Sequence, residues 1–233
     1  MKSEIKQAFD SIHASEALKA QTKAFLAQRA RRRPPFRRIG MVACTLLLLV
    51  LLGSVTLYFS PVAVISIDVN PSVELSVNRF DRIVEIKGLN EDGEKLAQNV
   101  QIRFLDYTQA VEQLLNSEEM QSYLGDDAIL SIGVIGKNTE RCDDIMVQLK
   151  TCTSTFNPYC YIANNEELEQ AHSLKLSCGK YRAFLALQQV NPSITPEEVS
   201  TMTMKEIQNL LEESGLQQMQ SGYHHGDGKR FHH

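Results

Sequence analysis

Histidine is scarce in this sequence, and the motifs of common enzyme classes are missing. The chain has six histidines among 233 residues, and four of them crowd into the last ten: His224, His225, His232 and His233. The other two, His13 and His172, lie on opposite sides of a long apolar segment. The sequence therefore offers no suitable histidine for a His-dependent catalytic triad. No Gly-rich phosphate loop, G-x-S-x-G or H-E-x-x-H motif occurs. We therefore expect no turnover enzyme, and a secreted hydrolase is the least favoured class.

Cysteine is sparse as well. Cys44 lies in the apolar segment, and four cysteines follow it: Cys142, Cys152, Cys160 and Cys178. Their spacings match no zinc site. An even number permits a disulfide outside the cytoplasm, with three possible pairings, but buried unpaired thiols are an equal alternative. The C-terminal histidines with Asp227 could hold a transition metal loosely, although such a composition is more typical of a disordered tail. We expect no metal and no cofactor.

Charge is absent from residues 39–59, which read IGMVACTLLLLVLLGSVTLYF and contain no Pro. As a helix, this stretch would cover about 30 Å, the thickness of a bilayer's hydrocarbon core. A buried core helix without a polar face would need protein on every side. A cleaved signal peptide would have shorter charged and apolar regions and a small-residue cleavage site. The sequence therefore predicts one uncleaved transmembrane helix.

Basic residues are missing directly after this segment, where the first is Arg79. Residues 1–38, in contrast, contain ten basic and three acidic residues. The positive-inside rule then predicts a single-pass cell-membrane protein whose N-terminus is cytoplasmic. The expected organisation is a cytoplasmic helical segment with a basic juxtamembrane linker (1–38), the span (39–59), an extracytoplasmic domain (60–214) and a disordered tail (215–233).

The cytoplasmic segment has the pattern of two short helices, the second following Ser15 as N-cap. Some 35 residues cannot build a core of their own. They could lie on the inner leaflet as an amphipathic stub, or they could bind a groove on a cytoplasmic partner. The candidate partner-binding residues are the apolar ones: Ile5, Phe9, Ile12, Leu18, Phe25 and Leu26.

Beyond the span, the sequence predicts an α+β fold, an α/β sheet domain with C-terminal helices. Alternating or β-branched runs indicate strands over 62–70, 72–78, 82–89, 128–136 and 143–151. Residues 90–95 are expected to open a connection. Apolar residues at helical spacing indicate helices over 107–116, 164–174, 178–190 and 203–214, with a further helix start at Thr195 and Pro196.

Asn70–Pro71 stands between two predicted strands, about ten residues after the span. Asn usually cyclises by attack of the next backbone nitrogen on its side chain, but Pro has no N–H and cannot act in this way. The remaining route is attack of the Asn amide nitrogen on its own main-chain carbonyl, which breaks the chain. A strained strand junction could accelerate this reaction. Nearby candidate helpers are Asp68, Ser72 and Glu74.

Asn-Pro is also a common turn dipeptide, and it recurs at Asn157–Pro158 and Asn191–Pro192. From chemistry alone, a turn is therefore the more common meaning of Asn70–Pro71.

Two segments resemble known proteins. Residues 65–96, ISIDVNPSVELSVNRFDRIVEIKGLNEDGEKL, are similar to the start of the extracytoplasmic domain of RsgI-type anti-sigma factors, found in Bacillota. Residues 177–211, SCGKYRAFLALQQVNPSITPEEVSTMTMKEIQNLL, are similar to a helical segment that accompanies that domain in many members. Together the resemblance covers roughly residues 62–211.

In that family, the cytoplasmic part holds an alternative sigma factor at the membrane, and the outer domain cuts itself at the Asn-Pro bond that matches Asn70–Pro71. The pieces stay associated by strand pairing. Loss of the outer piece then exposes the stub to an intramembrane protease, which frees the sigma factor. The resemblance implies these partners and no direct nucleic-acid binding. The family's usual N-terminal module is larger and contains strands, whereas residues 1–38 have helical patterns. The alternative is an envelope or sporulation-associated membrane anchor whose outer domain binds a partner.

Overall fold

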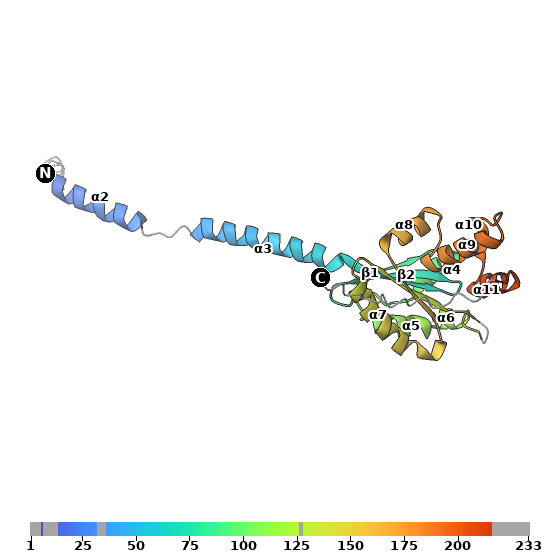
Figure 1. Ribbon diagram of the computed structural model, residues 1–233. Coiled ribbons are helices and arrows are strands. Elements are labelled where there is room, and N and C mark those ends of the chain that lie inside the picture. The colour runs from blue at the N-terminus through green and yellow to red at the C-terminus, as the bar shows by residue number, and fades with distance from the viewer. Residues whose placement is uncertain (1–5, 7–13, 32–35, 126–127, 216–233) are drawn as a thin grey trace, which may run out of the picture. The chain divides into compact units, whose positions relative to one another are not determined.

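The computed structural model describes residue 6 and residues 14–31, 36–125 and 128–215. The chain divides into two compact units, one ending at Val55 and the other beginning at Thr56. The described part of the first unit is helical, whereas the second unit holds a five-stranded sheet with helices on both faces (Figure 1). The second unit is thus a mixed α+β fold.

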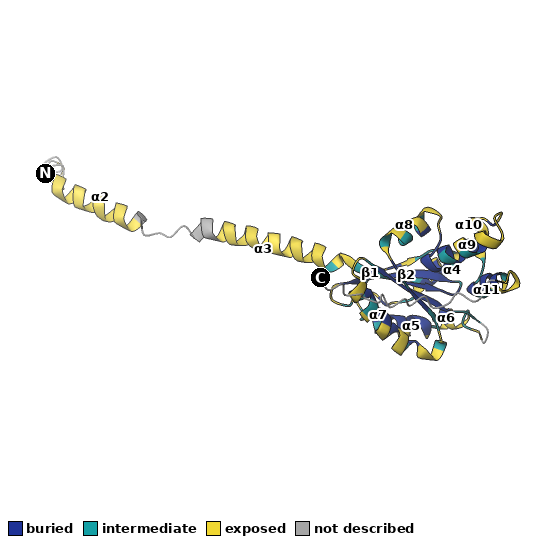
Figure 2. Cartoon of the chain, in the orientation of Figure 1, coloured by how far each residue is buried: buried dark blue, intermediate teal, exposed yellow. Residues whose placement is uncertain are grey.

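The first unit contains α2 (Glu16–Arg31) and most of α3 (Phe36–Phe59). Ser15 caps α2, because its Oγ accepts a hydrogen bond from the Leu18 N–H at 3.3 Å. Within α3, residues 40–59 have a mean hydropathy of 2.4, and the apolar stretch is not buried against protein (Figure 2). By length and composition, this helix can cross a membrane, which agrees with the span expected over residues 39–59.

The sheet of the second unit has the order β3-β2-β1-β4-β5. Its strands are β1 (Pro61–Asp68), β2 (Ser72–Asn78), β3 (Ile83–Gly88), β4 (Ser131–Gly136) and β5 (Tyr159–Ala163). All neighbouring pairs are antiparallel except β4 and β5, which are parallel. The first chain segment after α3 therefore forms the middle strand, hydrogen-bonded along both edges.

The two faces of β1 and β2 differ in chemistry because successive side chains of a strand point to opposite faces. One face carries apolar residues: Ile65, Ile67, Val73 and Leu75. The other carries polar residues: Ser66, Asp68, Ser72 and Glu74. All eight side chains are buried, so helices must cover both faces.

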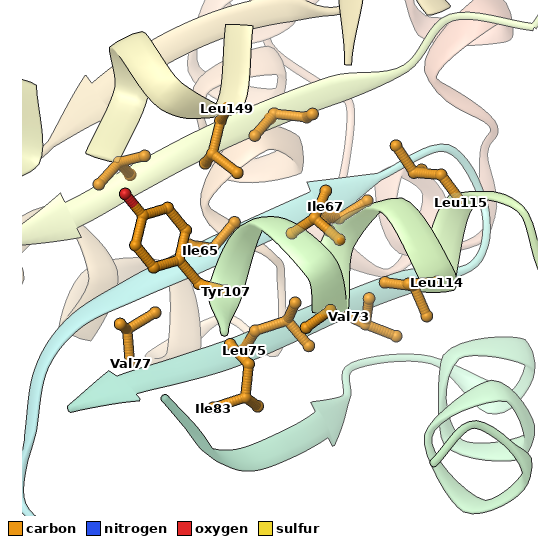
Figure 3. Packing of buried hydrophobic residues seen from close by; sticks show 14 of the residues in the cluster. Ile65, Ile67, Val73, Leu75, Val77, Ile83, Tyr107, Leu114, Leu115 and Leu149 are labelled. Atoms are coloured by element: carbon orange, nitrogen blue, oxygen red, sulfur yellow. The ribbon is translucent and has the colours of Figure 1, made fainter. Parts of the chain in front are cut away.

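Helices α5 (Tyr107–Leu115) and α7 (Thr139–Cys152) cover the apolar face (Figure 1). Leu114 and Leu115 of α5 and Leu149 of α7 point into this core and are fully buried (Figure 3). Each such side chain contributes about 1.5–3 kcal/mol relative to full exposure. The short helices α4 (Glu91–Asn99) and α6 (Glu118–Gln121) add Leu96 and Met120 to the same core.

Helices α8 (Asn165–Ser173) and α9 (Cys178–Val190) cover the polar face. Helices α10 (Pro196–Thr201) and α11 (Met204–Glu213) pack with α9 around a second apolar core that includes Phe184 and Ile207. Helix α10 starts at Pro196 after Thr195, as the sequence predicts, and Thr195 caps it in a capping box with Glu198.

Most predicted elements are confirmed, but the prediction of one strand was wrong and another strand was not predicted. The predicted strand over 143–151 lies inside α7, because Ile145, Met146 and Leu149 recur at helical spacing and face the core. The fifth strand is instead β5, which is short and follows the 3-10 turn Ser154–Phe156. The expected connection at residues 90–95 is also helical, since α4 starts at Glu91.

The cysteines are free thiols. Cys142 and Cys160 belong to the core under α7, with Cys152 packed against it, whereas Cys178 lies on the opposite side of the sheet. Burial raises the pKa of Cys178 to about 12. Of the two alternatives that the sequence left open, the structure has the buried unpaired thiols.

Candidate functional site

Asn70 and Pro71 lie at the tip of the hairpin that joins the two central strands. Asp68 of β1 pairs with Ser72 of β2, so the loop between them has three residues, 69–71. The loop is closed by a hydrogen bond from the Val69 N–H to the Pro71 carbonyl oxygen at 3.2 Å. The sequence-predicted scissile bond is therefore placed in a tight turn between two fully paired strands.

The backbone at Asn70 is strained. Its φ of 113° lies in a region that L-residues rarely adopt, beyond the left-handed well that Asn tolerates. The residue before a proline is further biased toward extended conformations with negative φ. Such a conformation costs on the order of 1–3 kcal/mol and persists only where the surroundings enforce it.

Asn90 holds the Asn70 side chain. Its Nδ2 donates a short hydrogen bond to Asn70 Oδ1. Its own Oδ1 accepts from the backbone N–H of Gly93 at 2.9 Å, which caps α4, and from that of Ser72 at 3.1 Å. One side chain thus joins the start of α4, the start of β2 and the amide of Asn70. Asn90 was not among the residues that the sequence predicts for this site, although an Asn directly before acidic residues is a helix N-cap signal.

The C-terminal helices also reach the hairpin tip. The Met204 N–H at the start of α11 donates to the Val69 carbonyl oxygen at 3.2 Å. A cavity of about 420 Å³ adjoins the same loop and is lined by Asn70, Tyr123, Ile129 and Lys205, among others. The Asn70 side chain is therefore partly accessible from this cavity, whereas Pro71 is buried.

A row of buried polar residues crosses the sheet next to the tip. Ser72, Asp68 and Ser131 stand opposite one another on β2, β1 and β4. One oxygen of Asp68 and the hydroxyls of Ser72 and Ser131 have no hydrogen-bond partner within the described residues. Helix α9 approaches so closely that a Cβ added to Gly179 would lie 2.6 Å from Asp68 Oδ2.

Burial raises the pKa of Asp68, because the carboxyl is removed from water. Ser177, at the N-cap of α9, and Lys180 oppose this shift. The Lys180 ammonium is itself buried, which lowers its pKa, and its Nζ donates to the Ser200 carbonyl oxygen at 2.6 Å. Asp68 accepts a hydrogen bond from the Ser66 hydroxyl at 3.1 Å. The carboxyl therefore favours its protonated form more than a solvated Asp does.

Glu74, the third candidate helper, is engaged elsewhere. Both of its carboxylate oxygens lie about 3 Å from His172 Nε2 on α8, and burial raises the Glu74 pKa. Glu74 pairs with Ser66, two register positions from the Asp68–Ser72 pair at the loop. Of the three candidates, Asp68 and Ser72 directly flank the turn, whereas Glu74 ties the sheet to α8.

The other two Asn-Pro sequences have different surroundings. Asn157 follows the 3-10 turn in the ordinary left-handed conformation, with φ of 44°. Asn191 has a negative φ at the end of α9, and its Oδ1 accepts from the N–H and the hydroxyl of Ser193. Only Asn70 among the three combines a hairpin tip with a φ beyond the left-handed well.

The candidate partner-binding residues lie in the first unit. Leu18, Phe25 and Leu26 are on α2 with 55–60% of their surface exposed. Ile5, Phe9 and Ile12 lie outside the described residues. The C-terminal histidines and Asp227 also lie outside them, and the described residues contain no cluster of His, Cys, Asp and Glu that could hold a metal.

Comparison with known proteins points to one family. The model of the anti-sigma factor RsgI-like central domain matches residues 62–186, which run from β1 into α9 and include the hairpin tip. The anti-sigma-I factor RsgI7 of Acetivibrio thermocellus is 26% identical over 186 residues, which cover 76% of this chain and 34% of the relative. The anti-sigma-I factor RsgI9 of the same organism is 23% identical over 196 residues, covering 76% and 28%. The chain thus spans about a third of the length of these relatives.

Proposed function

The chain belongs to the family of RsgI-type anti-sigma factors, and from this membership we propose that it is a membrane-anchored anti-sigma factor that signals by cutting itself at Asn70–Pro71. Its cytoplasmic segment sequesters an alternative sigma factor. Loss of the outer fragment allows an intramembrane protease to release that factor. The single observation that carries the self-cleavage is the strained hairpin tip, where the Asn side chain is held by Asn90.

The membrane topology follows from charge and length. Residues 40–59 have the length and composition of a span, with the basic residues concentrated before it. We place α2 in the cytoplasm and the sheet domain outside. The scissile bond is then eleven residues beyond Phe59, so the stub left by cleavage is short.

The cleavage is an intramolecular acyl transfer. Asn70 Nδ2 attacks the Asn70 carbonyl carbon, the bond from that carbon to the Pro71 nitrogen breaks, and the proton lost from Nδ2 reaches the Pro71 nitrogen. The products are a succinimide at the end of residues 1–70 and a new N-terminus at Pro71. Three features support this route: the strain at Asn70, the turn that positions its side chain, and the hydrogen bond from Asn90 to the amide oxygen. That bond stabilises negative charge on the amide as its nitrogen loses a proton.

The position of β1 explains how the fragments would stay together. After cleavage, β1 belongs to the membrane-bound fragment, whereas its neighbours β2 and β4 belong to the outer fragment. The ladders run from Asp68 back to Pro61 on one side and to Ala63 on the other, and a nick at residue 70 breaks none of their hydrogen bonds. Separation requires β1 to leave both neighbours together.

Cleavage is tested on the full chain purified in detergent. The wild type should run as two fragments on a denaturing gel, and intact mass should place the new N-terminus at Pro71. Asn70→Ala removes the nucleophile and should leave one band. The matched control is Asn191→Ala, which alters an Asn-Pro turn of ordinary geometry and should cleave like the wild type. A single uncut wild-type band would exclude self-cleavage.

Sigma-factor binding is tested by co-purification with the full chain. Phe25→Asp places a charge on the apolar side of α2 and should abolish recovery of a sigma factor, because an exposed aromatic anchor can contribute about 2 kcal/mol or more to an interface. Ala20→Asp, on another side of the same exposed helix, is the control and should retain the partner. If the unaltered chain recovers no sigma factor, the envelope-anchor alternative gains support.

A further inference from the structure

Two exposed phenylalanines from separate loops pack around the end of α3. Phe80 lies in the β2–β3 turn and stacks on Tyr58, with ring centroids 5.8 Å apart. Phe104 lies in the loop before α5 and contacts the Phe59 ring edge-to-face at 6.1 Å. About half of the surface of Phe59, Phe80 and Phe104 is exposed. We call these three residues, together with Tyr58, the aromatic patch.

Hydrogen bonds hold the loops of the patch in place. The buried Asn78 donates from Nδ2 to the Tyr58 carbonyl oxygen at 2.8 Å, and its Oδ1 accepts from the Phe80 N–H at 2.8 Å. The Phe104 N–H donates to the Ile83 carbonyl oxygen at 2.7 Å. Phe104 itself has a φ of 67°, which is rare for a bulky residue. The fold therefore keeps both rings exposed, and at Phe104 it does so at a conformational cost.

Arginine surrounds the patch on an otherwise acidic domain. Residues 60–215 contain 24 acidic and 12 basic residues, and only five of the basic ones are Arg. Three of these five arginines lie within two residues of Phe80 or Phe104 in the sequence, and all three are exposed: Arg79, Arg82 and Arg103. The guanidinium group is suited to bind phosphate. The combination of exposed aromatic rings with neighbouring cations is typical of segments that lie in a membrane interface.

We propose that the aromatic patch and these three arginines dock the sheet domain on the outer leaflet of the membrane. The rings lie at the boundary of headgroups and acyl chains, and the guanidinium groups bind lipid phosphates. This inference rests on the membrane anchoring in the proposed function. Phe59 is the last residue of the apolar helix, so a span that places residues 40–59 in the bilayer brings Phe59 to its surface. Phe80 and Phe104, in contact with the last two residues of that helix, are then at the same depth.

Docking changes what holds the fragments after cleavage. Tyr58 and Phe59 remain on the membrane-bound fragment, whereas Phe80, Phe104 and the arginines belong to the outer fragment. The outer fragment is then retained at two places, by β1 and by the lipid. Each exposed Arg near an anionic surface adds an electrostatic attraction to this retention. Simultaneous engagement at two places strengthens retention without any new contact within the protein.

The absence of Trp from the sequence permits a direct test. Single-Trp variants of the full chain, made uncleavable by Asn70→Ala, are reconstituted into vesicles of zwitterionic and anionic lipid. Phe80→Trp and Phe104→Trp report on the patch, and Leu51→Trp reports on the span. Leu185→Trp, at an exposed position of α9, is the soluble-face control. Lipids brominated near the headgroup end of the acyl chain quench a Trp at the depth expected for the patch, and lipids brominated near the end of the chain quench a Trp close to the bilayer centre, where Leu51 lies in a span over residues 40–59.

We expect both patch variants to lose emission in brominated vesicles, with Leu185→Trp unchanged. Replacing the three arginines by Gln should reduce this loss in anionic vesicles, whereas Lys175→Gln should not. If Leu51→Trp is quenched but neither patch variant is, docking is overturned while the membrane anchor is supported. A blue shift of the patch variants without quenching by lipid means that protein covers the patch, which also overturns docking. If Leu51→Trp itself is unquenched, the membrane anchor and docking both fail.

Discussion

At Asn70, different neighbours restrain the backbone and the side chain. The three-residue loop between paired strands imposes the positive φ, and Asn90 fixes the amide. The proposed self-cleavage needs both, because strain raises the energy of the intact bond while orientation lowers the entropy cost of attack. The two restraints can be separated by substitution at Asn90, which does not take part in the bond changes.

Asn90→Asp should slow cleavage about tenfold, since it keeps an oxygen for the N–H groups of Gly93 and Ser72 but loses the Nδ2 donor, a loss of roughly 1.4 kcal/mol. The rate is measured as the appearance of fragments from newly made full chain. Asn164→Asp, an equivalent change at the N-cap of α8, should have no effect on the rate. Cleavage of Asn90→Asp at the wild-type rate would exclude a role for this donor.

Asp68 makes the stability of the sheet domain depend on pH. Burial raises its pKa in the folded state above the ordinary value of 3.8, so folding favours the protonated carboxyl. The stability from this proton is fully present below that ordinary value and is lost as pH rises through the raised pKa. Each pH unit across that window lowers the free energy of unfolding by up to about 1.4 kcal/mol.

Asp68→Asn should remove the Asp68 part of this slope, leaving the part from the buried Glu74, and raise the free energy of unfolding at neutral pH. The measurement is urea unfolding of the uncleavable Asn70→Ala chain in detergent at a series of pH values. Glu85→Gln, an exposed change on β3, serves as control and should keep the wild-type slope. An identical slope in the Asp68→Asn chain would show that this carboxyl is not the titrating group.

Among the elements, β1 is the one on which retention of the proposed cleavage fragments depends. It is paired on both edges, and its apolar side chains Ile65 and Ile67 are fully buried under α5 and α7. A strand in this position cannot peel from an open edge. The hydrogen bonds of both ladders and the core contacts must be given up before the outer fragment leaves.

Ile65→Ala should therefore loosen the cleaved complex, because truncation of a buried Ile costs about 2–5 kcal/mol. The cleaved wild-type chain should elute as one complex in detergent and separate only in denaturant, whereas the variant should separate at a lower urea concentration. Val64→Ala, at a half-buried position of the same strand, should shift the midpoint less. Separation of the wild-type fragments without denaturant would contradict retention by β1.

At the scale of the whole molecule, the proposed functions follow the distribution of charge and the order of the segments along the chain. A basic segment, an apolar helix and an acidic sheet domain follow one another, and the scissile bond lies one strand beyond the helix. Because β1 is the first element of the domain, a cut at its far end leaves the inner fragment with one strand of the sheet. A domain that began with an edge strand would hold its cleaved fragment along a single ladder.

The sequence by itself determined the features that depend on neighbouring residues. The uncharged run at 39–59, the alternation in β1 and β2 and the helix start signal at Thr195 and Pro196 each arise from local chemistry, so the long apolar helix, the hairpin and α10 were predictable. Asn70–Pro71 was equally visible. The strand prediction for residues 143–151 was wrong because two patterns overlap there. Ile145 and Val147 alternate as in a strand, but the same stretch also places apolar residues on one side of a helix: Cys142, Ile145, Met146 and Leu149. Contact with the core favours the helix.

Only the tertiary structure decided what surrounds Asn70–Pro71. Asn90 is twenty residues from Asn70, Gly179 of α9 lies against Asp68 of β1, and Met204 of α11 donates to Val69. No local pattern encodes these contacts, because they depend on the order β3-β2-β1-β4-β5 and on the helices that cover each face. Phe80 and Phe104 likewise carry no local sequence signal, because each is a single aromatic residue in a loop. They form one patch only when the fold brings both loops to the end of α3.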